Sequence, residues 1–265
     1  MSVPPIDNWS RLLEGKIAVV TGGGVGIGAA IARLFAEHGA VVEVADIDPQ
    51  APEQIRADVS VDADVDRLAA TVLDRHGRVD VLVNNVGDYR PLVRFEKSTP
   101  QSWQRMYDVN LRHVFAVTRA FLPSMIERKG GVIINVHSVE GLRGYPGDPV
   151  YAAMKAAVAH FTTSLAVTVG RHGIRVNGIA PDLTQTPQVD YVTGYEEQQE
   201  LWPAWAPVGR LGQPEDQARV ALFLASDLSS YMTGHNIPVD GGTKAGGGWF
   251  FSPREGRFVN RPRHL

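Results

Sequence analysis

The sequence predicts an α/β protein of the doubly wound type, in which helices cover both faces of one parallel sheet. Short runs rich in Val and Ile alternate with longer helical stretches along the whole chain, and this alternation favours strand–helix–strand units. The runs are mostly apolar on both faces, as the strands of a buried parallel sheet are. We expect residues 1–265 to form a single domain of this fold.

Each predicted element follows from its local pattern. Val and Ile dominate the predicted strands, which are 16–21, 40–46, 79–85, 131–138, 174–180, 235–240 and, more weakly, 54–59. The stretches between them predict helices at 26–38, 62–76, 101–127, 149–171 and 214–226. Pro214 with Glu215 and Asp216 makes a good helix start. The N–H that proline lacks has no partner within the helix at its first position, and the positive end of the helix dipole favours acidic residues in the first turn.

Two long segments break this rhythm. Residues 181–213 are expected to be a substrate loop, because loops of this length in compact domains are usually functional or disordered. The loop offers apolar side chains for a pocket, and packing of the loop onto the sheet is an equally good use for them. These side chains are Tyr191, Tyr195, Leu201, Trp202, Trp205 and Val208.

Residues 243–265 form a C-terminal extension with four aromatic side chains: Trp249, Phe250, Phe251 and Phe258. A disordered tail seldom contains so many aromatics, so we expect it to be ordered with the aromatics buried against protein. It either packs on its own subunit or a neighbour for stability, or a neighbour's extension closes part of the substrate pocket.

Composition excludes several classes of protein. The 26 Lys and Arg against 29 Asp and Glu give a net charge of −3, so no basic field attracts nucleic acid or an anionic membrane. The chain has no cysteine and no HExxH motif, so we expect no metal site. We see no signal peptide and no run near the roughly 20 apolar residues of a membrane span, and expect a cytoplasmic protein.

The segment TGGGVGIG, residues 21–28, joins the first strand to the first helix. Gly22, Gly26 and Gly28 permit a tight turn and close approach of a pyrophosphate to backbone N–H groups. An ordinary glycine-rich turn would look similar in isolation. Between the first strand and first helix of an α/β chain, the motif predicts dinucleotide binding and a Rossmann-type sheet.

Asp46 ends the second predicted strand. A carboxylate there can accept hydrogen bonds from the ribose hydroxyls of an adenosine and would repel a 2′-phosphate. No Arg or Lys lies in the glycine loop or just after Asp46, so the sequence favours NAD over NADP. The alternative is that Asp46 only caps a turn with Asp48 and Pro49.

Tyr151 and Lys155 lie four residues apart in a predicted helix, in the segment YAAMK. Positions i and i+4 share one helix face, so a phenol and an ammonium group lie one turn apart. Hydride transfer at an alcohol carbon needs a base, and free tyrosine titrates near 10. A neighbouring cation favours the phenolate, so we expect Lys155 to lower the pKa of Tyr151.

Five features in this order resemble the short-chain dehydrogenase/reductase family: the TGxxxGxG loop, NNVG at 84–87, Asn110, Ser138 and the Tyr151/Lys155 pair. The resemblance covers about Leu13 to Gly242. It implies that Tyr151 is the acid/base, that Lys155 tunes it and binds the nicotinamide ribose, that Ser138 hydrogen-bonds the reacting oxygen, and that Asn110 holds a water in a proton relay.

The resemblance also implies the cofactor contacts. Asp182 stands where the family's PGxxxT segment has glycine, a departure that bears on the local backbone and the nicotinamide pose but not on the fold. Val86 stands where alanine is more frequent, and His137 is interpreted as structural because alternation turns it away from Ser138. The implied cofactor-binding residues are Gly22, Gly26, Ile27, Gly28, Asp46, Asp58, Val59, Asn85, Gly87, Tyr151, Lys155, Pro181, Thr184 and Thr186.

These residues predict an NAD-dependent oxidoreductase of secondary alcohols or ketones with an apolar substrate. Reduction of 3-oxoacyl thioesters is the alternative within enzymes, and a non-catalytic dinucleotide-binding regulator or scaffold is the alternative outside them. A YxxMxxxK arrangement for enoyl reduction would need lysine at Val158. The resemblance further implies a homotetramer built through the 101–127 and 149–171 helices and the C-terminal strand.

Overall fold

A computed structural model describes residues 8–189, 206–247, 250–252 and 257–259. One parallel sheet of seven strands forms its centre, in the order β3-β2-β1-β4-β5-β6-β7. The strands are β1 Ile17–Thr21, β2 Val41–Asp46, β3 Ile55–Arg56, β4 Val81–Asn84, β5 Gly131–Val136, β6 Ile174–Pro181 and β7 Asn236–Val239. The predicted fold class is confirmed, and the weakest predicted strand is also the shortest.

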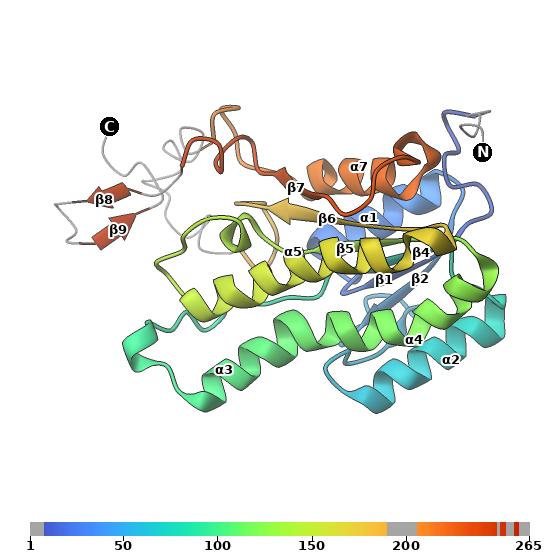
Figure 1. Ribbon diagram of the computed structural model, residues 1–265, viewed down its shortest axis with the longest axis horizontal. Coiled ribbons are helices and arrows are strands. Elements are labelled where there is room, and N and C mark those ends of the chain that lie inside the picture. Colours follow the sequence, from blue (N-terminus) through green and yellow to red (C-terminus); the bar gives the residue numbers. More distant parts are fainter. Residues whose placement is uncertain (1–7, 190–205, 248–249, 253–256, 260–265) are drawn as a thin grey trace.

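Helices cover both faces of this sheet (Figure 1). Helices α1 and α7 pack together on one face, and α2, α4 and α5 cover the other. The longer helices are α1 Gly26–Glu37, α2 Asp62–His76, α3 Pro100–Tyr107, α4 His113–Arg128, α5 Pro149–Val169 and α7 Pro214–Ala225.

Successive strand residues enter two separate apolar cores. Val20 and Ile134 pack in the α1–α7 core, whereas their neighbours Val19 and Ile133 pack in the core under α2, α4 and α5. Side chains of a strand alternate between faces, so a sheet covered on both sides needs apolar residues at consecutive positions. This requirement is why the strands were recognisable as continuous Val- and Ile-rich runs.

Strand β1 pairs with β2 on one side and with β4 on the other. The chain therefore builds the sheet outward from β1 in one direction and then from β4 in the other. At such a reversal the connections after the two strands diverge and leave a crevice at their carboxyl ends. Gly22 follows β1 and Asn85 follows β4, so both predicted site residues lie at this point.

The predicted helix over 101–127 is not continuous. A π-helical turn, Asp108–Arg112, separates α3 from α4, and the buried Asn110 lies at its centre. Both polar ends of the Asn110 side chain bond the backbone of Asp88, at 2.8 and 3.1 Å. π turns inside helices often accompany functional positions, and no Gly or Pro marks this one in the sequence.

Helix α5 begins at a strong local signal. The Asp148 side chain accepts hydrogen bonds from the N–H groups of Val150 and Tyr151, and Pro149 occupies the first helical position. By length and composition, the stretch Pro149–His172 could cross a membrane, contrary to the expectation from the sequence. This helix packs against β6, and core helices of sheet proteins can have the same length and apolar composition.

The described part of the C-terminal extension contains an antiparallel pair, β8 Phe250–Ser252 with β9 Arg257–Val259. In Figure 1 this pair lies apart from the central sheet, beyond the carboxyl ends of its strands. The predicted burial of the tail aromatics, and the loop residues between 190 and 205, lie outside the residues whose side chains are described.

Candidate active site

A cavity of about 1410 Å³ opens over the carboxyl ends of the parallel strands. Segments that follow β1, β2, β3, β4, β5 and β6 all contribute to its lining. Gly28 and Asn110 are predicted site residues that do not line it. The predicted residues that do are Gly22, Gly26, Ile27, Asp46, Asp58, Val59, Asn85, Gly87, Ser138, Tyr151, Lys155, Pro181, Thr184 and Thr186.

The glycine loop forms one wall of the cavity. Gly22 and Gly26 have φ angles of 62° and 59°, which favour glycine. A Cβ on Gly28 would lie 2.1 Å from the Gly22 carbonyl oxygen, so this position admits no side chain without a backbone shift. Asn85 braces the loop, because its Nδ2 donates to the carbonyl oxygens of Thr21 and Gly22 at 3.1 and 2.9 Å.

Asp46 lines the cavity at the end of β2. Its Oδ2 accepts a hydrogen bond from Gly24 N at 2.8 Å, and its Oδ1 accepts one from Asp48 N at 3.0 Å. The carboxylate therefore both caps its own turn and fastens the glycine loop, and each oxygen retains a further lone pair. Its neighbours in the cavity lining are Ile47 and residues 57–60, which include no Lys or Arg.

Asp58 and Val59 lie beyond β3 at the same end of the cavity. Asp58 Oδ1 accepts hydrogen bonds from the backbone N–H and the hydroxyl of Ser60, at 2.9 and 2.6 Å. Val59 is buried. The pair thus offers one polar and one apolar side chain to the cavity.

Tyr151, Lys155 and Ser138 meet at the other end of the cavity. Lys155 Nζ lies 5.7 Å from the centre of the Tyr151 ring, as the spacing on one helix face predicts. The ammonium group fits there because residue 87 is glycine: a Cβ on Gly87 would lie 2.5 Å from Lys155 Nζ. The hydroxyl of Ser138, which follows β5, accepts a hydrogen bond from Glu140 N at 3.1 Å.

The pKa of Tyr151 moves opposite to the expected direction. Burial raises it, the hydrogen bond with Ser138 lowers it, and the carboxylates of Glu140 and Asp88 raise it further. Burial also lowers the pKa of Lys155 to about 8. Within the protein alone burial of the phenolate outweighs the other contributions, and the lowering expected from Lys155 together with the positive charge of oxidised nicotinamide stays a prediction.

Asn110 lies behind the cavity wall rather than in it. Its contacts with the Asp88 backbone hold the segment that follows Gly87, and a Cβ on Gly87 would lie 3.1 Å from Asn110 Oδ1. The structure therefore places Asn110 next to the Lys155 side of the site as a brace of that segment.

The segment Pro181–Thr186 crosses the cavity from the end of β6. Gln217 donates a hydrogen bond to Thr184 Oγ1 at 3.2 Å and fixes its centre. Asp182 needs no glycine-like backbone, since Lys129 is the sole described non-glycine residue with a positive φ. The Asp182 carboxylate instead lies 3.1 Å from Arg143.

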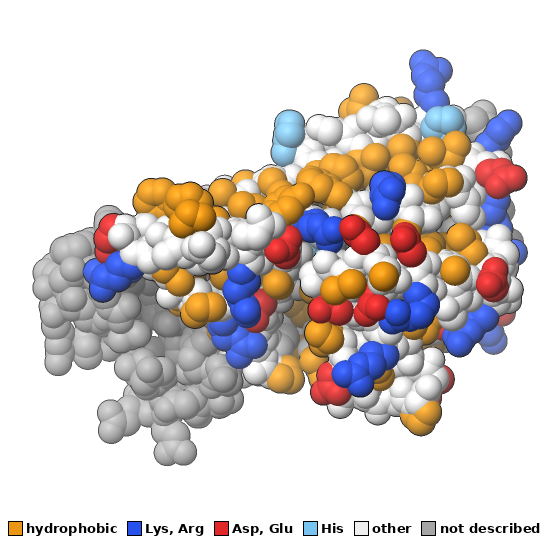
Figure 2. Space-filling view, turned by 90° about the horizontal axis from the view of Figure 1, so that it is seen from below, with side chains coloured by type: hydrophobic (Ala, Val, Ile, Leu, Met, Phe, Trp, Pro, Cys, Tyr) orange, Lys and Arg blue, Asp and Glu red, His pale blue; other side chains and the backbone are white. Residues whose placement is uncertain are grey.

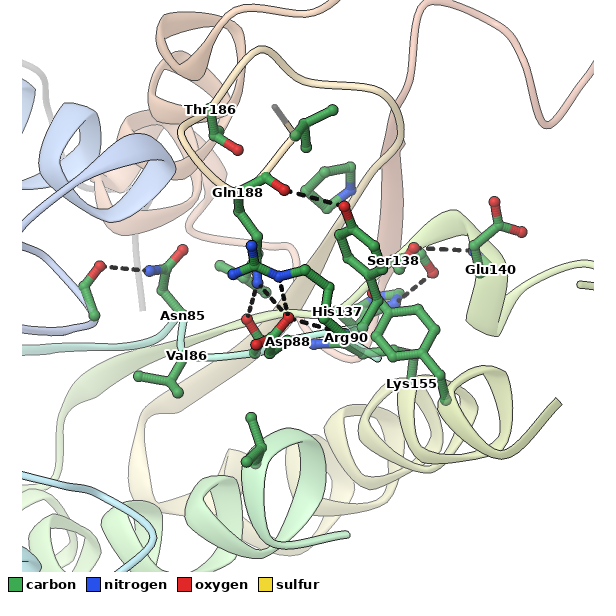
Figure 3. Close-up of a pocket in the computed structure, with 18 of the residues that line it drawn as sticks. Asn85, Val86, Asp88, Arg90, His137, Ser138, Glu140, Lys155, Thr186 and Gln188 are labelled. Atoms are coloured by element: carbon green, nitrogen blue, oxygen red, sulfur yellow. Dashed lines mark hydrogen bonds and ion pairs between the residues drawn. The ribbon is translucent and has the colours of Figure 1, made fainter. Parts of the chain in front are cut away.

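The sequence missed a set of contacts across the mouth of the cavity. Gln188 Nε2 donates to Gly87 O and to Asp88 Oδ1, both at 3.0 Å, and the Tyr89 hydroxyl donates to Gln188 O at 3.0 Å (Figure 3). These bonds join residues about 100 positions apart. In the sequence, the sign of these contacts was Asp88, an acidic residue directly after NNVG.

Two buried histidines also line the cavity. The ring of His137 packs over Gly178 of β6, where a Cβ would lie 2.9 Å from its Nε2. His137 nevertheless lines the same cavity as Ser138, contrary to the expectation that alternation turns it away, so its structural role stays a prediction. His113, which the sequence analysis did not single out, begins α4. Burial lowers the pKa of His137 to about 4 and that of His113 to about 3, so both are neutral near pH 7.

Comparisons with known proteins find similar sequences over most of this chain. A family model described as enoyl-(acyl carrier protein) reductase matches residues 22–244. The 3-oxoacyl-(acyl-carrier-protein) reductase FabG of Thermotoga maritima is 40% identical over 246 residues, 87% of this chain and 98% of its own length. Galactitol 2-dehydrogenase of Rhizobium johnstonii is 40% identical over 245 residues, 87% of this chain and 95% of its own.

A solved structure is similar over the same region. The 3-ketoacyl-(acyl-carrier-protein) reductase of Brucella melitensis, complexed with NADH, superimposes with a TM-score of 0.80 at 34% identity. The match covers 87% of this chain and 99% of that one. The similarity therefore extends over most of the chain.

Proposed function

This chain belongs to the short-chain dehydrogenase/reductase family, and we propose that it transfers a hydride between NAD(H) and a secondary alcohol or the matching ketone. It is an oxidoreductase acting on CH–OH groups. The observation that carries the proposal is the meeting of Ser138, Tyr151 and Lys155 in the cavity that also contains the glycine loop and Asp46. The three side chains proposed for proton exchange thus line the same cavity as the residues proposed to bind the dinucleotide.

The proposed chemistry divides between cofactor and chain. A bound NAD(H) accepts or supplies the hydride. Tyr151 exchanges the hydroxyl proton, and Ser138 hydrogen-bonds the reacting oxygen. Lys155, cationic below its pKa of about 8, adds its charge to that of oxidised nicotinamide and offsets the burial that disfavours the phenolate.

The test of this proposal is turnover rather than binding. A panel of secondary alcohols, polyols and 3-oxoacyl thioesters should include compounds that change the NADH signal continuously over many cycles. Binding of NADH without turnover of any of them, at pH 7 to 10, would favour a regulator or scaffold instead.

Substrate choice has two candidates. Apolar residues in the cavity lining, such as Leu92, Phe95, Leu183 and Val189, support an apolar alcohol or ketone. Similarity to two reductases of acyl-carrier-protein thioesters supports 3-oxoacyl reduction. Enoyl reduction is disfavoured, since Val158 stands where that arrangement needs lysine.

We also propose that a homotetramer forms through α4 and α5. Phe115 and Phe161 stack edge to face across these helices, with ring centres 4.8 Å apart, and Phe115 remains 37% exposed. In Figure 2 apolar side chains form a band along one edge, while acidic and basic ones are interspersed over the rest of that face. Exposed apolar bands of this kind suit association.

We expect the enzyme to prefer NAD(H), because Asp46 accepts ribose hydroxyls and repels a 2′-phosphate. Asp46→Ala should lower kcat/KM with NAD by about 10-fold, as loss of a charged hydrogen-bond partner does, and narrow the gap to NADP. Steady-state kinetics with both cofactors and one substrate measure this.

The matched control is Asp48→Ala, which removes a carboxylate two residues away that does not line the cavity. Asp48→Ala should leave the ratio of kcat/KM with NAD to kcat/KM with NADP unchanged. Equal or higher efficiency of the unaltered protein with NADP would refute the assignment of Asp46.

A further inference from the structure

Three neighbouring strands send segments to one buried ionic cluster at their carboxyl ends. Glu140 and Arg143 follow β5, Asp182 follows β6 and Thr243 follows β7. Because β5, β6 and β7 are adjacent in the sheet, these segments meet although Arg143 and Asp182 are 39 positions apart and Asp182 and Thr243 are 61 positions apart. We call these four residues the Arg143 cluster.

The cluster is held by short polar contacts. Arg143 Nε and Nη2 bind the Glu140 carboxylate at 3.2 and 2.9 Å, and Nη2 also lies 3.1 Å from Asp182 Oδ2. The Thr243 hydroxyl donates to the same Asp182 oxygen at 2.5 Å. The side chains of Arg143, Glu140 and Asp182 are 9%, 10% and 8% exposed, so each charge depends on its partners.

The cluster presents its negative groups to the cavity. Glu140 and Asp182 line it, whereas the guanidinium of Arg143 lies behind them. The charges of the Glu140, Asp182 and Arg143 side chains sum to −1. Without Arg143 the same wall would carry −2.

This wall adjoins Tyr151. The turn Val139–Gly141 packs directly on α5, because a Cβ on Gly141 would lie 2.6 Å from the backbone N of Ala156. The ring of Tyr145, two residues beyond Arg143, meets the Tyr151 ring at a centre distance of 6.1 Å. Glu140 thus belongs to the turn that follows Ser138 and contacts the helix that carries Tyr151, and its charge raises the Tyr151 pKa.

We propose that Arg143 is a positioning residue that neutralises Glu140 and Asp182 beside Tyr151 and so sets the pH range over which Tyr151 exchanges its proton with substrate. The inference rests on the proposed function of Tyr151. It assigns a task to Asp182, the residue that departs from the glycine of the family pattern.

None of the variants that test this proposal removes any other charged group around Tyr151. Asp88 and Tyr89 face it from the segment after β4, Ser138 and Tyr145 from the segment after β5, and Lys155 from α5 itself. Asp88 is bound by Arg90 and Gln188. His113 and His137 are neutral above about pH 5, given their pKa values of about 3 and about 4.

The experiment follows kcat/KM for alcohol oxidation against pH at saturating NAD, which reports the titration of the cofactor-bound enzyme. The rate rises as Tyr151 loses its proton, so a more negative wall moves the midpoint to higher pH. Arg143→Gln should raise the midpoint by about half a pH unit or more, and Glu140→Gln should lower it by a similar amount. The double variant restores the wall charge of −1 and should return the midpoint to its original value.

Arg175→Gln is the matched control. Arg175 is a partly buried arginine outside the cavity, bonded to Ser229 and to the Ser226 carbonyl, so its loss is structural. It should lower thermal stability without moving the midpoint.

An unmoved midpoint in Glu140→Gln, or a displaced midpoint in the double variant, overturns the proposal, and the first of these results holds even if Arg143→Gln fails to fold. The variant Tyr151→Phe distinguishes failure of the proposed function from failure of the inference about Arg143. If Tyr151→Phe keeps its activity, the assignment of Tyr151 fails; if that variant is inactive while all midpoints coincide, the inference about Arg143 alone fails.

Discussion

Tyr151→Phe is expected to lower kcat for alcohol oxidation by at least ~100-fold, the typical effect of removing a general acid/base. The change keeps the ring that stacks on Tyr145 and lies beside Lys155, so the cavity retains its shape. It removes the phenolic proton carrier that faces Ser138 in the cavity. NADH binding, measured by fluorescence, should change by less than about 3-fold, because the hydroxyl is a small part of the cofactor site.

Tyr145→Phe is the matched control, since it removes a hydroxyl from a stacked ring in the same cavity. We expect it to cost less than about 10-fold in kcat, below the range for a lost acid/base. Substantial activity in Tyr151→Phe, or an equal loss in both variants, would show that Tyr151 is not the proton carrier.

Gly28→Ala is expected to impair both cofactor binding and stability. Its Cβ would lie 2.1 Å from the Gly22 carbonyl oxygen and 2.6 Å from Asn85 Nδ2, so the loop and its brace must both move. Overpacking of this kind costs about 1–3 kcal/mol in the free energy of unfolding, a fall in Tm of about 2–10 °C. Displacement of the loop amides should weaken NADH binding by about 10-fold or more.

Gly170→Ala makes the same chemical change where nothing lies within 4 Å, at a residue with helical φ and ψ of −57° and −35°. It should leave NADH affinity unchanged and Tm equal or slightly higher, since alanine favours helix. Normal NADH affinity in Gly28→Ala would mean that the loop does not approach the cofactor closely.

Much of the fold was predictable because local patterns carry it. Val19 and Val20 had to be apolar for two different cores, and this made β1 visible as a continuous run. Asp148 and Pro149 marked the start of α5, so the shared face of Tyr151 and Lys155 followed from helix geometry. The short strand β3 gave a weak signal, because only two residues, Ile55 and Arg56, enter the sheet.

Other features had no local signal. The π turn at Asn110 replaces a predicted continuous helix, and the sequence around it contains neither Gly nor Pro. The bonds between Gln188 and Asp88 depend on two connections that meet only across the folded sheet. The direction of the Tyr151 pKa depended on burial, which residue spacing does not reveal.

The sequence by itself therefore determined the order of strands and helices, the glycine loop, Asp46 at its strand end, and the one-turn spacing of Tyr151 and Lys155. Each of these is set by residues within a few positions of one another, where periodicity and backbone preference act directly. Only the tertiary structure decided which strand ends are neighbours, and hence that Glu140, Arg143, Asp182 and Thr243 form one buried cluster. The reason is physical: burial and charge pairing are properties of the packed chain, because they depend on groups that are distant in sequence and adjacent only across the sheet.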